Sequence, residues 1–224
     1  MPLTDAETER GHPPTWSPRA VVFDFGGVLI TPITNQIDKI AGTNGATAAA
    51  MREVLLGPRE SGAGHPWHRA ERGEIAVAEI QDLLRPWAER LDVPLHGDEI
   101  DRMLAAGEYT VVDEMVACVD DVRRAGHATG LLTNTFAEFR PTLERDLDLA
   151  LFDVVIESYA VGSRKPEHFI YEATADALGV AHDRIVYLDD FDQNLEPPEA
   201  LGWTTIHVTD PAAAIRELVD LLPG

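Results

Sequence analysis

Short apolar runs recur along the chain, and most of them end at polar residues or glycine. They are rich in β-branched residues and only three to five residues long. Runs this short are typical of strands buried on both faces, as in a parallel sheet. The runs are residues 20–23, 128–132, 154–156, 185–188 and 205–208.

Helical patterns separate these runs in the second half of the chain. One spans residues 112–124 and closes at Gly126, and another is opened by Lys165-Pro166 and ends at Gly179. A final helix is predicted after Asp210 as its cap, with proline at its first position. Strands that alternate with helices predict an α/β fold with a Rossmann-like, doubly wound parallel sheet.

The pattern between the first two strands is helical throughout. Helices are predicted over 46–56, 74–91 and 98–106, with no strand among them. We therefore expect an α-helical cap at residues 34–110, inserted into a core made of 19–33 and 111–224. Residues 1–18 are polar, hold four prolines, and are expected to form a loose N-terminal tail.

Charge and composition narrow the possible partners. The net charge of −21 disfavours nucleic acid and anionic membranes. No apolar run is long enough to span a bilayer, and the start of the chain does not resemble a secretory signal. The single cysteine, Cys118, fits a reducing compartment, so a cytoplasmic location is expected. An anionic substrate would need a cation, and Lys39 and Lys165 are the only lysines.

Polar side chains lie where the predicted strands end. Ligands of open α/β sheets bind beyond the carboxyl ends of the strands, so groups placed there should converge on one crevice. These groups are Asp24, Thr133, Asn134, Asp189 and Asp190, joined by Lys165 in the loop that follows residues 154–156.

This set of side chains suits phosphoryl transfer. A carboxylate on a tight turn, such as Asp24, can attack phosphorus and form an aspartyl-phosphate. Magnesium would offset the repulsion between the two anions. Asp24 and Asp190 are the expected ligands, with the carbonyl of Gly26 as a third and Asp189 as a more distant contributor.

The remaining groups are expected to hold the phosphate. The Thr133 hydroxyl, Asn134 and the backbone at Gly26 and Gly27 would contact phosphoryl oxygens. Lys165 would supply a fixed positive charge. A small phosphorylated substrate is therefore the expected partner.

Four segments together resemble the motifs of haloacid-dehalogenase-like hydrolases. They are Val-Val-Phe-Asp24-Phe-Gly-Gly-Val-Leu, Leu-Leu-Thr133-Asn134, Arg164-Lys165-Pro166, and Tyr-Leu-Asp189-Asp190-Phe-Asp-Gln-Asn194. The chain is most similar to the phosphatase-like N-terminal domain of soluble epoxide hydrolases and to a related domain fused to some acyl-CoA dehydrogenases. The resemblance implies a cap over the active site and magnesium-dependent phosphatase chemistry.

One position departs from this family pattern. The first motif usually carries a second aspartate, which protonates the leaving group and then activates water, and Gly26 stands in its place. A catalytically weak binding or regulatory domain is therefore one alternative. Carbon–halogen hydrolysis is another, because halide leaves without protonation.

Other residues allow two interpretations. Asn194 either caps a helix or supports the site. His65 and His68 flank Pro66, but no third residue completes a zinc site. Trp67 belongs either to the core of the cap or to a surface facing the crevice, and we favour the second interpretation for this segment.

Overall fold

The computed structural model describes residues 19–58, 64–105 and 109–222, so the predicted tail of residues 1–18 lies outside them. Its centre is a parallel five-stranded sheet with the order β3-β2-β1-β4-β5. The strands are β1 (Ala20–Phe23), β2 (Ala128–Thr133), β3 (Val154–Glu157), β4 (Ile185–Asp189) and β5 (Thr204–His207). This confirms the predicted fold class.

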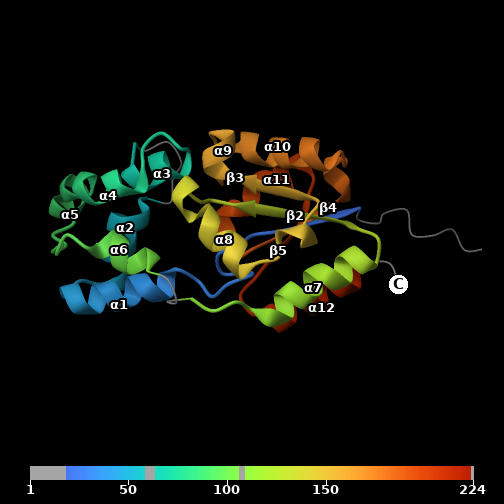
Figure 1. The fold of residues 1–224 in the computed structure, drawn as a ribbon, viewed down its shortest axis with the longest axis horizontal. Helices are drawn as coiled ribbons and strands as arrows, with labels where there is room; N and C mark the ends of the chain where they lie inside the picture. Colours follow the sequence, from blue (N-terminus) through green and yellow to red (C-terminus); the bar gives the residue numbers. More distant parts are fainter. Residues whose placement is uncertain (1–18, 59–63, 106–108, 223–224) are drawn as a thin grey trace, which may run out of the picture.

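Helices cover both faces of the sheet (Figure 1). They can do so because successive side chains of each strand point to opposite faces, and both sets are apolar. On β1, Val21 and Phe23 pack into one apolar cluster, whereas Ala20 and Val22 pack into another on the opposite face. The first face is covered by α7 (Asp113–Arg124), α8 (Arg140–Asp146) and α12 (Pro211–Leu221). The second is covered by α9 (Ser158–Val161), α10 (His168–Leu178) and α11 (Glu196–Leu201).

Short 3₁₀ helices join several of these elements. They are η1 (Ala137–Phe139), η2 (Leu149–Leu151), η3 (His182–Arg184) and η4 (Asp192–Asn194). No helix within the described ranges is long and apolar enough to cross a bilayer.

A separate group of helices lies beyond one end of the sheet (Figure 1). It has its own apolar core, which includes Ile37, Met51, Ile80 and Ile100. Its helices lie within the segment predicted as a cap. They are α1 (Thr34–Asn44), α2 (Ala48–Leu56), α3 (Pro66–Glu71), α4 (Val77–Leu83), α5 (Arg85–Arg90) and α6 (Glu99–Leu104).

The cap is tied to the core at two places. The segments that enter and leave the cap run side by side, and the Thr31 N–H donates to the Thr110 carbonyl at 2.9 Å. At the far side, a buried ion pair joins Glu71 of α3 to Arg164 of the core. The Trp67 ring also meets Phe136 edge-on, at 4.7 Å between ring centroids. The cap therefore rests directly on the loops at the carboxyl ends of the strands.

Two predicted helices differ from those observed, and proline is involved in both. The predicted helix at 74–91 is two helices, α4 and α5, because Pro86 lacks an N–H and its ring clashes with the preceding turn. The helix expected to open at Pro166 begins instead at His168. Glu167 ahead of it has an extended backbone, and the Lys165–Pro166 peptide is cis.

The predicted cap at Asp210 is present and allows a stability test. Asp210 Oδ1 accepts the Ala213 N–H at 2.8 Å and so satisfies one of the free N–H groups of α12. Asp210→Ala should lower the free energy of unfolding by about 1 kcal/mol, whereas Asp210→Asn, which keeps the acceptor, should change it little. Urea unfolding of both variants measures this, and equal losses would show that the hydrogen bond accepted by the side chain of residue 210 is not what stabilises α12.

Candidate active site

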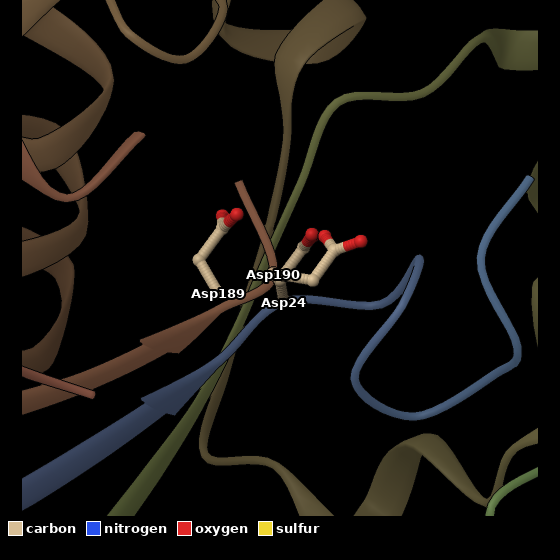
Figure 2. Close-up of side chains that lie close together, drawn as sticks. All are labelled: Asp24, Asp189 and Asp190. Atoms are coloured by element: carbon tan, nitrogen blue, oxygen red, sulfur yellow. The ribbon is translucent and has the colours of Figure 1, made fainter. Parts of the chain in front are cut away.

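Three carboxylates meet where β1 and β4 end (Figure 2). Asp24 directly follows β1, Asp189 is the last residue of β4, and Asp190 comes next. Because β1 and β4 are neighbouring parallel strands, their carboxyl ends lie side by side. One ligand oxygen from each aspartate lies within 4.8 Å of the others. The arrangement therefore concentrates negative charge at the edge of the sheet.

Lys165 supplies the positive charge at this cluster. Its Nζ lies 2.7 Å from Asp24 Oδ1 and 2.7 Å from Asp189 Oδ2. Burial acts to lower the pKa of Lys165, but the charges of Asp189 and Asp24 outweigh it and raise that pKa. Three carboxylates against one ammonium leave a surplus of two negative charges when all are ionised.

Asp189 is fully occupied by the protein. Besides Lys165, it accepts hydrogen bonds from the Tyr187 hydroxyl and from the Phe191 N–H at 2.8 Å. The Asn194 amide donates to both of its oxygens, at 3.0 and 3.1 Å. Asn194 therefore supports the site, and α11 has no side-chain cap. With these partners, Asp189 is placed to hold Lys165 rather than to bind a metal directly.

Asp190 has the opposite surroundings. Its Oδ1 is buried without a hydrogen-bond partner. Gly27, with φ of +81°, makes room for this side chain, because a Cβ there would lie 2.0 Å from Asp190 Oδ2. Burial, then the charges of Asp24 and Asp189, raise the pKa of Asp190 to about 8. Burial likewise raises that of Asp24 to about 7, although Lys165 opposes it.

These features fit a divalent cation. Magnesium prefers carboxylate oxygens and usually binds through one or two of them together with water and substrate oxygens. Asp24 and Asp190 offer such a pair, and a cation there would balance the surplus charge. Within the described ranges, this is the only cluster of histidine, cysteine or acidic residues close enough to hold a metal. The carbonyl of Gly26 as a third ligand stays a prediction.

The two residues predicted to hold phosphate at the end of β2 have different environments. The Asn134 side chain accepts the Lys165 N–H at 2.8 Å and donates to the Lys165 carbonyl at 3.0 Å, so it fixes the loop that carries the lysine. The Thr133 hydroxyl has a long contact, 3.5 Å, to the Asn134 carbonyl and lines the cavity. Gly27 lies against Asp190, as described above.

A cavity of about 750 Å³ opens between these groups and the cap. Asp24, Thr133, Lys165 and Asp190 lie on its core side. Its other walls are largely apolar and come from both the cap and the core. The apolar residues that sequence reasoning missed here include Ile30, Ile33, Leu56, Met103, Phe136 and Phe139.

The cap segment around Trp67 contributes to the cavity. Trp67 and His68 line it, and Trp67 is also part of the apolar core of the cap. His65 is structural, since one ring nitrogen accepts the Trp67 N–H at 3.2 Å and the other contacts the Val54 carbonyl at 3.1 Å. The histidines therefore do not form a metal site with any third described residue.

A family model described as haloacid dehalogenase-like hydrolase matches residues 18–202. The chain belongs to this family. The match includes both strand ends that carry the aspartates and the loop of Lys165.

Curated relatives agree with this assignment. The chain is 29% identical to mouse acyl-CoA dehydrogenase family member 10 and 29% identical to rat bifunctional epoxide hydrolase 2. About 90% of the chain is aligned, but it spans only 19% and 38% of those proteins. It is 26% identical to the sesquiterpene phosphatase astK of Aspergillus oryzae, over 91% of this chain and 96% of that protein.

Solved structures of the same fold include different members of the family. One is a Bacteroides thetaiotaomicron enzyme in complex with magnesium and inorganic phosphate, with a TM-score of 0.61, 19% identity, and coverage of 85% of this chain and 94% of that one. Another is the L-2-haloacid dehalogenase of Xanthobacter autotrophicus, with a TM-score of 0.61, 20% identity, and coverage of 92% and 85%. At these identities the likeness concerns the fold.

The two adjacent aspartates should differ in their effect on metal binding. Asp190→Asn should weaken magnesium affinity about tenfold more than Asp189→Asn, because only Asp190 has a free oxygen for a cation. Calorimetric titration of magnesium measures both, with Asp220→Asn on the exposed face of α12 as the control for net charge. Equal losses, or a larger loss for Asp189→Asn, would contradict the assignment.

Proposed function

We propose that this chain is a magnesium-dependent phosphatase that uses Asp24 as a covalent nucleophile. The observation that carries the proposal is the buried, unpartnered oxygen of Asp190 beside Asp24 and Lys165. A buried carboxylate oxygen without a partner costs free energy, and a cation bound between substrate and protein would remove that cost. Asp24 and Asp190 would hold the ion.

The residues divide the reaction between them. Asp24 attacks phosphorus, a new P–O bond forms, and the bond to the leaving oxygen breaks, which gives an aspartyl-phosphate. Water then attacks phosphorus, releases phosphate and regenerates Asp24. Lys165 and the Thr133 hydroxyl stabilise the phosphoryl oxygens. Bound magnesium would supply charge compensation as the two anions approach.

The cavity favours a substrate with a bulky apolar group. Its volume of about 750 Å³ is larger than a phosphate alone requires. Its walls include the apolar side chains of Leu56, Met103 and Phe136. The similarity to a protein named sesquiterpene phosphatase supports the same substrate class. We therefore propose an apolar organic phosphate rather than a small polar metabolite.

Carbon–halogen hydrolysis is one alternative, since a solved dehalogenase shares this fold. Halide departs without a metal, so that chemistry gives the free oxygen of Asp190 no partner. A regulatory or binding role without turnover is the other alternative. It is favoured by Gly26, which supplies no carboxylate to the cavity.

Replacement of the nucleophile tests the mechanism. Asp24→Asn should fold, bind magnesium weakly and lose turnover of an aryl phosphate by a factor of about 10⁴ or more, since an amide cannot attack phosphorus. Acid-quenched wild-type enzyme should carry one added phosphoryl group on the peptide with Asp24, detected by mass spectrometry. Turnover that survives in the variant, or that does not require magnesium in the wild type, would reject the proposal.

The missing acid at Gly26 predicts which leaving groups are accepted. The wild type should hydrolyse aryl phosphates far faster than alkyl phosphates, because an alkoxide leaves poorly without a proton. Gly26→Asp should raise alkyl-phosphate turnover about tenfold or more, and an added Cβ there meets no atom within 4 Å. Gly26→Asn is the matched control without acid. Equal rates for the two variants, or a wild type insensitive to leaving-group pKa, would contradict the argument.

A further inference from the structure

Arg164 is a buried arginine whose terminal nitrogens remain open to the cavity. It is the only buried arginine among the described residues, at 7% exposed, and it lines the cavity. Its Nε donates a hydrogen bond to Glu71. Nη1 and Nη2 have no hydrogen-bond partner in the described parts of the chain, and both are accessible to water. A ligand in the cavity can therefore reach them.

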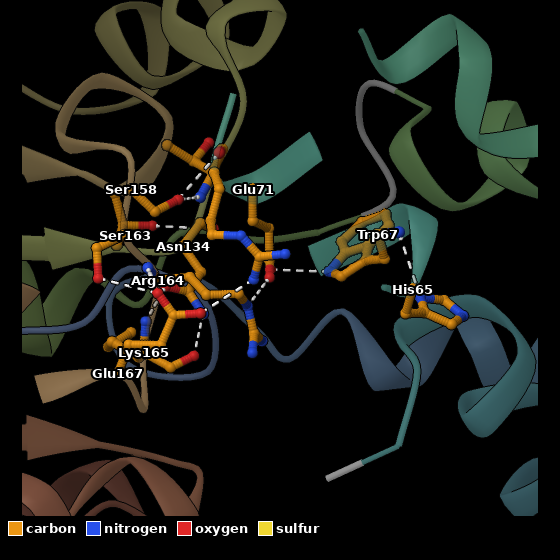
Figure 3. A network of polar contacts seen from close by, with 12 residues as sticks. His65, Trp67, Glu71, Asn134, Ser158, Ser163, Arg164, Lys165 and Glu167 are labelled. Atoms are coloured by element: carbon orange, nitrogen blue, oxygen red, sulfur yellow. Dashed lines mark hydrogen bonds and ion pairs between the residues drawn. The ribbon is translucent and has the colours of Figure 1, made fainter. Parts of the chain in front are cut away.

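The contact with Glu71 orients this guanidinium without occupying its outer edge (Figure 3). A guanidinium carries its N–H donors in a rigid plane, and Nη1 and Nη2 form a fork that matches two oxygens of a carboxylate or phosphate. Glu71 is itself fixed, because it accepts the Trp67 indole N–H at 2.8 Å. The Arg164 backbone N–H is also held, by Glu167 at 3.1 Å. The free fork is therefore preorganised, which lowers the entropic cost of binding an anion.

Among the described residues, two further side chains with a permanent positive charge line the cavity, and carboxylates already bind both. Lys165 lies between Asp24 and Asp189. Arg52 donates twice from Nη2 to Asp38, at 2.6 and 2.8 Å, and its side chain is 44% exposed. Water screens a pair this exposed, which weakens its attraction for any further anion. Neither side chain combines burial with a free fork.

The charge of Arg164 acts on the cap side of the cavity. Burial, followed by this charge, lowers the pKa of His68 to about 3, so that the histidine is neutral and adds no second cation there. The cation that chiefly acts on the pKa values of Asp24 and Asp190 is Lys165 instead. A substrate with its phosphate at Asp24 would therefore meet Arg164 with its organic part.

We propose that Arg164 is a specificity-determining residue that binds a second oxyanion on the organic part of the substrate, a carboxylate or a phosphate, through Nη1 and Nη2. The inference rests on the proposed phosphatase function and refines its substrate class. The substrate would combine the phosphate to be cleaved, an apolar body that fits the cavity, and an oxyanion near α3. With a net charge of −21 the protein otherwise repels a further anion, so a preference for one requires a local cation.

Matched probes that differ in the charge of their tail test the proposal. They are 4-(ω-carboxyalkyl)phenyl phosphates and the ω-carbamoyl counterparts, which have the same shape but a neutral tail, over a series of chain lengths. A third set with an ω-phosphono tail distinguishes phosphate from carboxylate. All share a phenolic leaving group, and arylmethylphosphonates with the same tails report binding without turnover. At the length that reaches Arg164, the wild type should prefer an anionic tail to the carbamoyl tail about tenfold or more, in kcat/KM and in Kd.

Substitutions at Arg164 should remove this preference selectively. Arg164→Gln combined with Glu71→Gln leaves no unpaired buried charge and should bring both ratios to one or below. Arg164→Lys, which keeps the charge but loses the fork, should retain only a small part of the preference. Arg52→Gln, at the exposed arginine of the cavity lining, and Arg90→Gln, at an exposed cap arginine outside it, should both keep the wild-type ratios. Each ratio compares two probes on one variant, so a general loss of activity cancels.

The outcomes separate the two proposals. A wild-type Kd ratio of one or below at every chain length, a ratio that survives the double substitution, or one that depends on Arg52 instead would overturn the role of Arg164. A preference in Kd that depends on Arg164, with no magnesium-dependent hydrolysis of any probe, would instead reject the phosphatase function. Thermal melting shows whether each variant is folded. If the double variant is not, Arg164→Lys carries the test, and unchanged wild-type ratios in it would overturn the proposal.

Discussion

The placement of one ammonium group between two buried carboxylates governs the rest of this site. Lys165 lies 2.7 Å from both Asp24 and Asp189, with almost no access to water. Breaking a buried ion pair from one side leaves an uncompensated charge, which is strongly destabilising. The loop that carries Lys165 is accordingly held at its backbone by Asn134 and beside it by the ion pair of Arg164 with Glu71 (Figure 3).

Asp189 and Asp190 are adjacent and chemically identical, but their hydrogen bonds give them different roles. Asp189 is saturated by donors from β4, from the following loop and from Lys165. Asp190 keeps one buried oxygen free and depends on the missing side chain of Gly27 for its position. The surplus negative charge is thus directed to the side of the cluster that borders the cavity. There it can attract a cation, and a cation is what an anionic substrate requires.

The cap and the core contribute different parts of recognition. The core supplies the groups proposed for the phosphoryl end: Asp24, Thr133 and Asp190 lie where strands end, and Lys165 lies in the loop between α9 and α10. The cap supplies part of the apolar walls, among them Leu56 and Met103. Glu71 connects the two, because it binds Arg164 directly beside Lys165 while it also orients Trp67. A substrate that fits the cap therefore meets the same helix that stabilises the lysine loop.

The sequence by itself determined the layered fold and the residues that converge. Short apolar runs ending in Asp24, Thr133 and Asp189 sufficed, because parallel strands place their carboxyl ends at one edge whatever lies between them. Local patterns were wrong about where some helices begin and end. At Pro86, for example, the apolar spacing predicted one continuous helix, but proline interrupts it.

Only the tertiary structure decided which partner each polar atom has. In the folded protein, Asn134 binds the Lys165 backbone and Asn194 binds Asp189. One buried atom of Asp190 and one of His68 have no hydrogen-bond partner. No spacing rule gives this result, because the partners come from both near and distant positions: Asn194 lies five residues from Asp189, whereas Asn134 lies 31 residues from Lys165. Whether a buried oxygen or nitrogen is satisfied depends on all of those segments together.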